Sequence, residues 1–250
     1  MSSLPSEIRV AALTHRGKVR SKNEDAMALG RKLFFGDMEQ PFVAELQDEP
    51  TVLIVADGMG GHVKGEIASR SVLETLRDGV YPDDILAWDR ALSFANDRLY
   101  DLMRLRPEVI GLGSTIVGVS LSADRTTYFN VGDSRAYRHS LHALEQVSRD
   151  DVPFPASRNE ARRTSQITQA LGGRSFRTKI LPHVLAGPPM RIGETILLCS
   201  DGLTDMISDE EICKILDDPA EPALSVQRLA DAALLAGGRD NISVIVARAY

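Results

Sequence analysis

The chain has 250 residues, of which 43% are hydrophobic and 26% are charged, and its formal net charge is −6. This composition is typical of a globular protein, and the mild acidic excess argues against a nucleic-acid binder, which usually carries a basic surplus. With two cysteines, no recognisable signal peptide and no apolar run long enough to cross a membrane, we expect a cytoplasmic protein without a disulfide framework.

The first quarter of the chain predicts strands joined by loops. Residues 8–15 alternate weakly between apolar and polar side chains and predict a strand. Residues 36–50 are acidic and end in proline, which favours a surface loop. The β-branched run over residues 51–57 is typical of a strand that is covered on both faces. Clustered glycines follow this run and predict a sharp break.

Two helical patterns come after the glycines. Residues 65–79 carry apolar side chains at near-helical spacing, and Gly79 is a plausible end. Residues 83–105 show a longer amphipathic pattern that stops before Pro107. We therefore expect a first pair of helices here.

The middle of the chain changes to short runs. Between residues 113 and 147, Gly, Asp and Ser interrupt apolar segments about every ten residues, which predicts an antiparallel meander. Residues 150–177 are polar, basic and weakly periodic, and a short helix could form over residues 161–172.

The last quarter predicts strands, a second helix pair and a final strand. Strand patterns occupy residues 179–190 and 194–200, and Ser208 with Glu211 forms a capping-box signature at a helix start. A helix closed by glycines then covers residues 222–238, and residues 242–250 form a strand. This order predicts an α+β fold with two antiparallel sheets packed together, helices outside, and one domain over residues 1–250.

Four aspartates lie where strand-like runs stop. They are Asp57, Asp133, Asp201 and Asp240, and glycine accompanies three of them. A carboxylate at a strand end projects into a loop-lined edge, where several can surround a hard divalent cation. The pattern points to a metal-dependent enzyme.

The sequence lacks the motifs of two other classes of enzyme, the cysteine phosphatases and the P-loop nucleotide enzymes. A cysteine phosphatase needs arginine six positions after the cysteine, but Asp205 and Pro219 follow Cys199 and Cys213 at that distance. No phosphate-binding loop of the GxxxxGK[ST] type occurs. We expect both cysteines to be buried hydrophobic residues.

Four histidines favour structural roles. The spacing of His139 and His142 matches no familiar zinc pattern, so we do not expect these two to form a metal pair. The other histidines with this expectation are His15 and His183.

Seven segments, in the family's order and spanning residues 20 to 247, resemble the metal-dependent Ser/Thr protein phosphatases of the PPM (PP2C) family in its compact bacterial form. They read RSKNEDA, VADGMGGH, GSTIVGVSL, NVGDSRAYRH, ITQALGG, LLCSDGLTDMIS and GGRDNISVIVA. The resemblance implies a four-layer α/β/β/α sandwich and a bacterial signalling phosphatase that opposes a Ser/Thr kinase.

The resemblance also implies a pair of Mn²⁺ or Mg²⁺ ions, with a third, weaker ion in bacterial relatives. Asp57 is expected to bridge the pair, with the Gly58 carbonyl as a further ligand. The remaining implied metal residues are Asp201 and Asp240 at the second ion, Glu24 and Asp25 through bound waters, and Asp133 at the third ion.

Three residues have implied catalytic roles. Arg20 would grip the phosphate, Asp25 would act beside the metals, and His62 would protonate the leaving group. Animal members carry histidine at the position of Met59, so His62 is a departure. Asp151 is another, because histidine is frequent there, and the flap that follows near residues 150–177 is short.

The implied reaction is direct attack of a metal-bound hydroxide on the phosphorus of phosphoserine or phosphothreonine in proteins, without a covalent phosphoenzyme. Expected partners are phosphoprotein substrates and a cognate kinase system, with no nucleic acid or membrane, and we expect a monomer. The alternative is a catalytically silent member that binds phosphoproteins as a scaffold. Such members usually lose metal carboxylates, which this chain retains.

Overall fold

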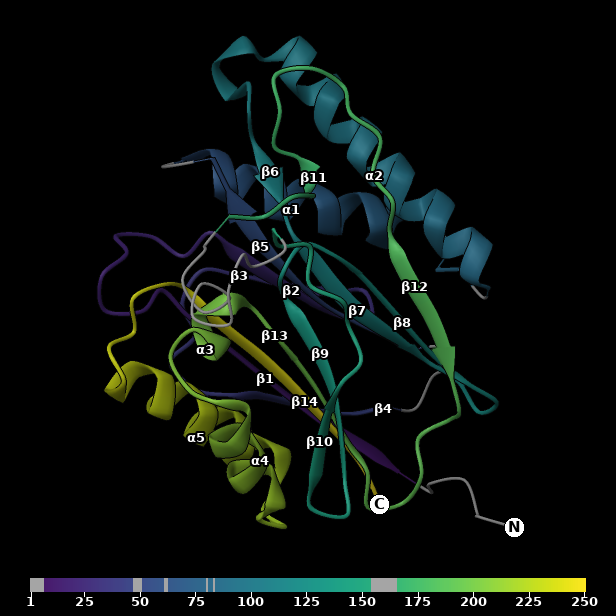
Figure 1. Ribbon diagram of the computed structural model, residues 1–250, viewed down its shortest axis with the longest axis vertical. Coiled ribbons are helices and arrows are strands. Elements are labelled where there is room, and N and C mark those ends of the chain that lie inside the picture. The colour runs from purple at the N-terminus through teal and green to yellow at the C-terminus, as the bar shows by residue number, and fades with distance from the viewer. Residues whose placement is uncertain (1–6, 47–50, 61–62, 80, 83, 154–165) are drawn as a thin grey trace.

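The computed structural model describes residues 7–46, 51–60, 63–79, 81–82, 84–153 and 166–250. Figure 1 shows two twisted sheets lying face to face, with helices on the outer face of each. Every strand pair in both sheets is antiparallel across the described residues. The predicted α+β sandwich of four layers is therefore confirmed.

The first sheet, called sheet one, has six strands in the order β10-β9-β13-β14-β1-β4. The last strand along the chain lies in the middle of this sheet, between β13 and β1. The strands are β1 (Ile8–His15), β4 (Phe42–Leu46), β9 (Arg135–Ser140), β10 (Ala143–Gln146), β13 (Thr195–Cys199) and β14 (Ile242–Ala249).

The second sheet, called sheet two, has eight strands, and β5 is central because it pairs with β2, β6 and β7. Its strands are β2 (Asp25–Leu29), β3 (Lys32–Phe35), β5 (Thr51–Met59), β6 (Gly113–Ser114), β7 (Ile116–Leu121), β8 (Thr126–Val131), β11 (Leu171–Gly172) and β12 (His183–Gly187).

Helices cover the outer face of each sheet. The pair α1 and α2 packs on sheet two, and α4 and α5 pack on sheet one (Figure 1). None of the described helices is long and apolar enough to cross a membrane. The helices are α1 (Val63–Asp78), α2 (Ile85–Leu105), the short 3₁₀ helix η1 (Pro107–Val109), α3 (Asp201–Thr204), α4 (Asp209–Asp217) and α5 (Pro222–Leu235).

Three apolar cores separate the four layers. Between the first helix pair and sheet two, Trp88 stacks on Phe129 with ring centroids 4.0 Å apart. A second core fills the space between the sheets, and a third lies under α4 and α5. Alternate residues of one strand serve neighbouring cores, since Ile54 of β5 belongs to the first and Leu53 to the second.

Two local predictions were wrong. Residues 36–50 were expected to be a loop, but residues 42–46 form the edge strand β4, which pairs with β1. Its exposed side chains include Glu45, and charge on an edge strand hides the strand pattern. The helix expected over residues 161–172 is absent from the described part, residues 166–172, where Leu171 and Gly172 pair with β6 instead.

Candidate active site

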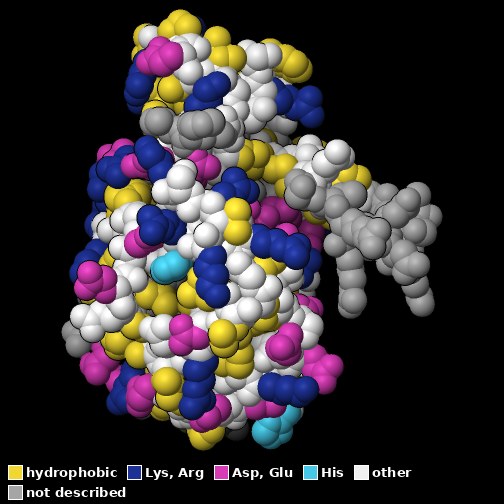
Figure 2. Space-filling model, turned by 90° about the vertical axis from the view of Figure 1, so that its left-hand side faces the viewer, with side chains coloured by type: hydrophobic (Ala, Val, Ile, Leu, Met, Phe, Trp, Pro, Cys, Tyr) yellow, Lys and Arg dark blue, Asp and Glu magenta, His cyan; other side chains and the backbone are white. Residues whose placement is uncertain are grey.

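Carboxylates from both sheets meet at one edge of the sandwich. Sheet two contributes Asp57, near the end of β5, and Asp25, its register partner at the start of β2. Sheet one contributes Asp201, which begins α3 directly after β13, and Asp240, which precedes β14. Figure 2 views the molecule from the side of these loops and shows basic side chains interspersed with acidic ones.

Burial and mutual repulsion oppose ionisation of this cluster. Burial raises the pKa of Asp57 well above its ordinary value, and Asp25, Asp201 and Asp240 raise it further. The pKa of Asp201 is raised in the same way, by burial and then by Asp133 and Asp240. Burial is also the largest cause that raises the pKa of Asp25 to about 6. Carboxylates gathered so closely stay ionised only beside compensating positive charge.

A buried chain of hydroxyl groups fixes Asp25. The Ser243 hydroxyl donates to Asp25 Oδ2 at 2.7 Å, and the Ser200 hydroxyl donates to the same oxygen at 2.9 Å. Thr14 Oγ1 lies 2.7 Å from Ser243 Oγ and accepts a hydrogen bond from Asn23 Nδ2. Because Ser243 and Ser200 belong to sheet one and Asp25 to sheet two, these bonds join the sheets at the site.

Two buried carboxylate oxygens of the cluster are suited to bind a divalent metal ion. Asp25 Oδ1 and Asp201 Oδ1 are buried and accept no hydrogen bond from the described residues. A buried carboxylate oxygen without a donor is costly, and a hard cation satisfies it. The set of carboxylates with the Gly58 carbonyl nearby is the oxygen-rich environment that Mg²⁺ and Mn²⁺ prefer.

Gly58 is required by a close backbone approach. A Cβ atom there would lie 2.1 Å from the carbonyl oxygen of Gly65, in the first turn of α1, and 2.6 Å from that of Glu24. Only glycine lets the end of β5 pack this tightly. The glycine after Asp57 thus allows the end of β5, α1 and the Glu24 loop to pack together.

A second close backbone approach joins the segments that carry Asp201 and Asp240. A Cβ atom at Gly202 would lie 1.9 Å from the carbonyl oxygen of Asn241. The Asn241 side chain accepts from the Glu24 backbone N–H at 2.8 Å and donates to the Arg16 and Lys22 carbonyls. Asn241 therefore positions the loop that carries Glu24, a role that the sequence reasoning missed.

Arg20 lies at the rim of the cluster. Its Nη2 donates to Asp240 Oδ2 at 2.5 Å, and its side chain is 52% exposed. A half-exposed guanidinium beside the carboxylates is placed to meet an anion arriving from solvent. The structure thus brings Arg20 to the predicted metal residues.

Asp133 lies in the turn between β8 and β9. Burial raises its pKa to about 6, and Asp150 and Asp205 raise it as well. The neighbouring Ser134 hydroxyl is 2.7 Å from that of Thr115, which fixes the turn. Asp205 is exposed and lies one helical turn after Asp201. This spacing places a further carboxylate near the site, and the sequence analysis did not use it.

The proposed general acid, His62, lies outside the described residues. The flap near residues 150–177 is described only at its two ends. There, Asp151 Oδ1 bonds His183 Nε2 at 2.9 Å, and Oδ2 accepts from the Gly132 N–H and Gln169 Nε2, each at 2.9 Å. Asp151, which stands where histidine is frequent in the family, therefore connects the start of the flap to β12.

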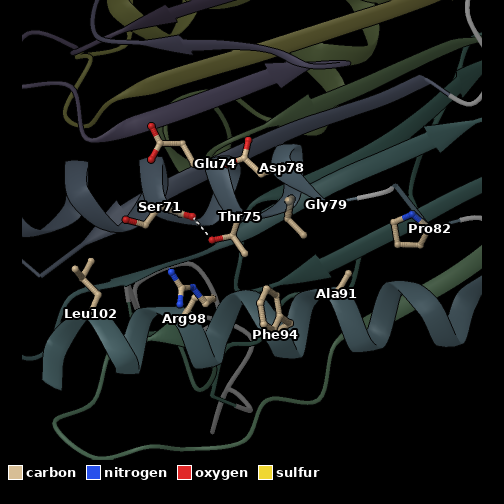
Figure 3. Close-up of a pocket in the computed structure, with 11 residues that line it drawn as sticks. Ser71, Glu74, Thr75, Asp78, Gly79, Pro82, Ala91, Phe94, Arg98 and Leu102 are labelled. Carbon is tan, nitrogen blue, oxygen red and sulfur yellow. Dashed lines mark hydrogen bonds between the residues drawn. The ribbon is translucent and has the colours of Figure 1, made fainter. Parts of the chain in front are cut away.

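A separate hollow of about 550 Å³ lies between α1 and α2, away from the carboxylates. Figure 3 shows Phe94 and Arg98 of α2 facing Thr75 of α1, whose hydroxyl donates to the Ser71 carbonyl at 2.7 Å. The lining includes none of the carboxylates of the cluster, so the hollow is a groove distinct from the candidate active site.

Comparison with known proteins finds protein phosphatases. The family model described as Protein phosphatase 2C matches residues 37–234. The chain is 33% identical to the serine/threonine protein phosphatase PstP of Mycobacterium tuberculosis, over 99% of this chain and 46% of PstP. It is 28% identical to the serine/threonine phosphatase stp of Listeria monocytogenes, over 93% of this chain and 92% of stp. The chain thus spans about half the length of PstP.

Solved structures show the same likeness. The catalytic domain of PstP in complex with two manganese ions superposes with a TM-score of 0.76 and 32% identity, covering 97% of this chain and 99% of that chain. PppA, a regulatory component of T6SS in Pseudomonas aeruginosa, gives a TM-score of 0.76 and 28% identity, covering 100% and 99%.

Proposed function

Because the chain belongs to the protein phosphatase 2C family, we propose that it hydrolyses phosphoserine and phosphothreonine in proteins in a reaction that needs Mn²⁺ or Mg²⁺. The observation that carries this proposal is the convergence of Asp25, Asp57, Asp201 and Asp240 at one edge, where two buried carboxylate oxygens lack a hydrogen bond from the described residues. Relatives named as Ser/Thr phosphatases support the substrate class.

The proposed metal residues have distinct roles. Asp57 and the Gly58 carbonyl would help to hold one ion, and Asp57, Asp201 and Asp240 would hold a second. Asp133 would contribute to a third, weaker ion. When bound, the ion pair supplies an activated water nucleophile and offsets the charge of the phosphate group. The two manganese ions in the PstP structure support a pair of ions as the cofactor.

The protein side chains provide orientation. Arg20 binds the phosphate, since a guanidinium fork matches two phosphate oxygens, and it exchanges its contact with Asp240 to do so. Asp25 stays fixed through Oδ2, which leaves Oδ1 to accept a hydrogen bond from water in the site, and Glu24 serves the same water-binding purpose. His62 protonates the leaving alkoxide.

The cellular setting is also part of the proposal. We place the chain in the cytoplasm as a single catalytic domain and a monomer, acting against a Ser/Thr kinase. The names of the bacterial relatives support a signalling role.

The deciding experiment measures hydrolysis of p-nitrophenyl phosphate and of a phosphothreonine peptide with Mn²⁺, and again with excess EDTA. We expect turnover that requires Mn²⁺ and disappears in Asp57→Ala, while thermal melting shows that the variant is folded. A folded, metal-loaded protein without turnover would instead support the phosphoprotein-binding scaffold.

A further inference from the structure

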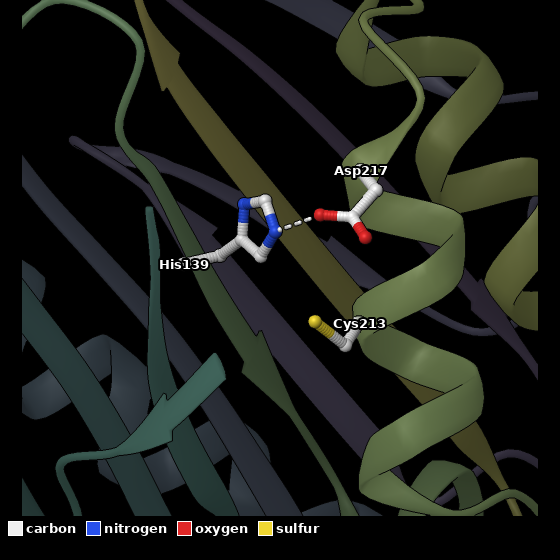
Figure 4. A group of neighbouring side chains, drawn as sticks. All are labelled: His139, Cys213 and Asp217. Atoms are coloured by element: carbon white, nitrogen blue, oxygen red, sulfur yellow. Dashed lines mark hydrogen bonds and ion pairs between the residues drawn. The ribbon is translucent and has the colours of Figure 1, made fainter. Parts of the chain in front are cut away.

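A second cluster of metal-ligand side chains lies far from the carboxylates. His139 is near the end of β9, His142 is in the turn that leads to β10, and Cys213 and Asp217 stand four residues apart on α4. Residues four apart on a helix lie on the same face, so both α4 side chains reach the β9–β10 hairpin. Figure 4 shows His139, Cys213 and Asp217 pointing toward one another.

The distances bring three ligand atoms together, from His139, Cys213 and Asp217, and place His142 beside Asp217. His139 Nε2 lies 2.8 Å from Asp217 Oδ1, and His142 Nδ1 lies 3.0 Å from the same oxygen. Cys213 Sγ is 3.4 Å from the His142 carbonyl oxygen. The ligand atoms of His139, Cys213 and Asp217 lie within 4.8 Å of one another.

Burial and charge suit a cation here. His139 is 8% exposed in its side chain, Asp217 is 30% exposed and His142 is 83% exposed, so the cluster opens to solvent on one side. Hydrogen bonds from His139 and His142 lower the pKa of Asp217, which keeps this carboxylate ionised. Two imidazole nitrogens within hydrogen-bond distance of one carboxylate oxygen bring nitrogen and oxygen ligand atoms together on the open side of the cluster.

We propose that His139, His142, Cys213 and Asp217 bind one Zn²⁺ ion, which joins α4 to the β9–β10 hairpin. Zn²⁺ takes four ligands from imidazole nitrogen, thiolate sulfur and carboxylate oxygen, and this cluster offers all three types. On binding, the Cys213 thiol releases one proton to solvent, and the single proton of each neutral imidazole moves to the ring nitrogen that faces away from the ion. One thiolate and one carboxylate then neutralise the ion.

The proposal departs from the expectation that His139 and His142 form no metal pair. Their spacing alone fits no zinc pattern because the other two ligands come from a helix much later in the chain. The cluster is also separate from the active site. His139 is six residues beyond Asp133 along an extended segment, a separation of about 20 Å at about 3.3 Å per residue.

The ion would stabilise the β9–β10 turn more than the rest of the cluster. Leu141 and His142 both have positive φ, +50° and +63°, a conformation that favours glycine or asparagine. β10 is the edge strand of sheet one, and α4 packs beside it. An ion shared by the turn and α4 would hold both the turn and the edge strand.

Cobalt titration of the full chain, already loaded with Mn²⁺, tests the proposal without requiring turnover. Thiolate-bound Co²⁺ has an intense near-ultraviolet charge-transfer band, which oxygen ligands do not give. We expect one equivalent of Co²⁺ to produce the band, Zn²⁺ to remove it, and Cys213→Ser to abolish it. His142→Ala, at an exposed position, should weaken Zn²⁺ binding at least tenfold.

Lys214→Ala is the matched control, because Lys214 lies on α4 but pairs with Glu210. It should keep the band, and Cys213→Ser should keep Mn²⁺-dependent hydrolysis. Absence of the band in the wild-type chain, or its persistence in Cys213→Ser, would overturn the proposal. The latter result would assign the band to Cys199, the second cysteine of the chain.

Discussion

Asp25 is held by serine hydroxyl groups rather than by a basic side chain, so its charge is left for the ions in the site. Ser243 is the better placed of the two serines, because it both donates to Asp25 Oδ2 and lies 2.7 Å from Thr14. Its hydrogen bond also lowers the pKa of Asp25, in opposition to burial. Removing the hydroxyl should therefore make Asp25 a poorer partner for cations.

We predict that Ser243→Ala raises the Mn²⁺ concentration for half-maximal activity about tenfold, since a hydrogen bond to a charged group contributes about 1.5–3 kcal/mol. The measurement is hydrolysis of p-nitrophenyl phosphate across a Mn²⁺ titration. Ser225→Ala is the control, because Ser225 is buried in α5 and its hydroxyl has no partner among the described residues. An unchanged Mn²⁺ titration in Ser243→Ala would contradict the role of the hydroxyl chain.

The raised carboxyl pKa values set the pH dependence of the metal-free protein. Asp25 and Asp133 have folded pKa values of about 6, above the value of about 3.9 for an unfolded aspartate. The folded state then binds these protons more tightly, so the contribution of the two groups to stability is full below about pH 4 and is lost as pH rises through 6. In EDTA, the melting temperature should be higher at pH 5.5 than at pH 7.5.

Saturating Mn²⁺ should remove or reverse this difference, because the cation replaces the protons. Exposed carboxylates with lowered pKa values, such as Asp217 and Asp218, do not interfere, since their contribution changes only below about pH 4. Thermal melting at the two pH values, with EDTA and with Mn²⁺, checks both statements. If the metal-free protein had a higher melting temperature at pH 7.5 than at pH 5.5, the raised carboxyl pKa values would not be the cause of the pH dependence.

At the scale of elements, the contact of α3 with the loop before β14 sets the distance between Asp201 and Asp240. We predict that Gly202→Ala lowers kcat/KM at least 100-fold, because its Cβ would lie 1.9 Å from the Asn241 carbonyl oxygen and push the two elements apart. Gly187→Ala in β12 is the control, since its nearest non-neighbouring atoms are 3.8 Å away. Near-wild-type kinetics in Gly202→Ala would show that this contact does not set the site.

The sequence predicted most elements because their patterns are local. The capping box at Ser208, for instance, is present at the start of α4, as expected. The strand β4 was missed because its charged edge resembles a loop, and β2 and β3 were not assigned because they are short. At the site, acidic motifs marked the carboxylates, whereas Ser200, Ser243 and Asn241 were missed because an isolated hydroxyl or amide reveals its partner only in three dimensions.

At the scale of the whole molecule, the site joins the two sheets. Asp25 and Asp57 belong to strands of sheet two, while Asp201 follows β13 and Asp240 precedes β14 of sheet one. Bound ions would therefore stabilise the packing of one sheet on the other. Mn²⁺ at about 100 times its Kd should add about 2.7 kcal/mol to the free energy of unfolding.

Denaturant unfolding with Mn²⁺ and with EDTA measures this gain. Asp57→Ala should lose most of it, because the residue expected to bridge the ion pair is gone. Leu185→Ala, at a side chain that is 54% exposed, should keep it. If Mn²⁺ stabilised Asp57→Ala as much as the wild-type chain, the ions would be binding elsewhere.

The position of β14 has a consequence for biosynthesis. This strand is encoded last among the described strands, yet it lies between β1 and β13 in the middle of sheet one. While the chain is still being made, the edges of β1 and β13 lack their partner, and Asp240 has not yet joined Asp25. The carboxylate cluster is therefore incomplete until β14 leaves the ribosome, and until then we expect the unpaired strand edges to be the part of the chain that is most prone to aggregation.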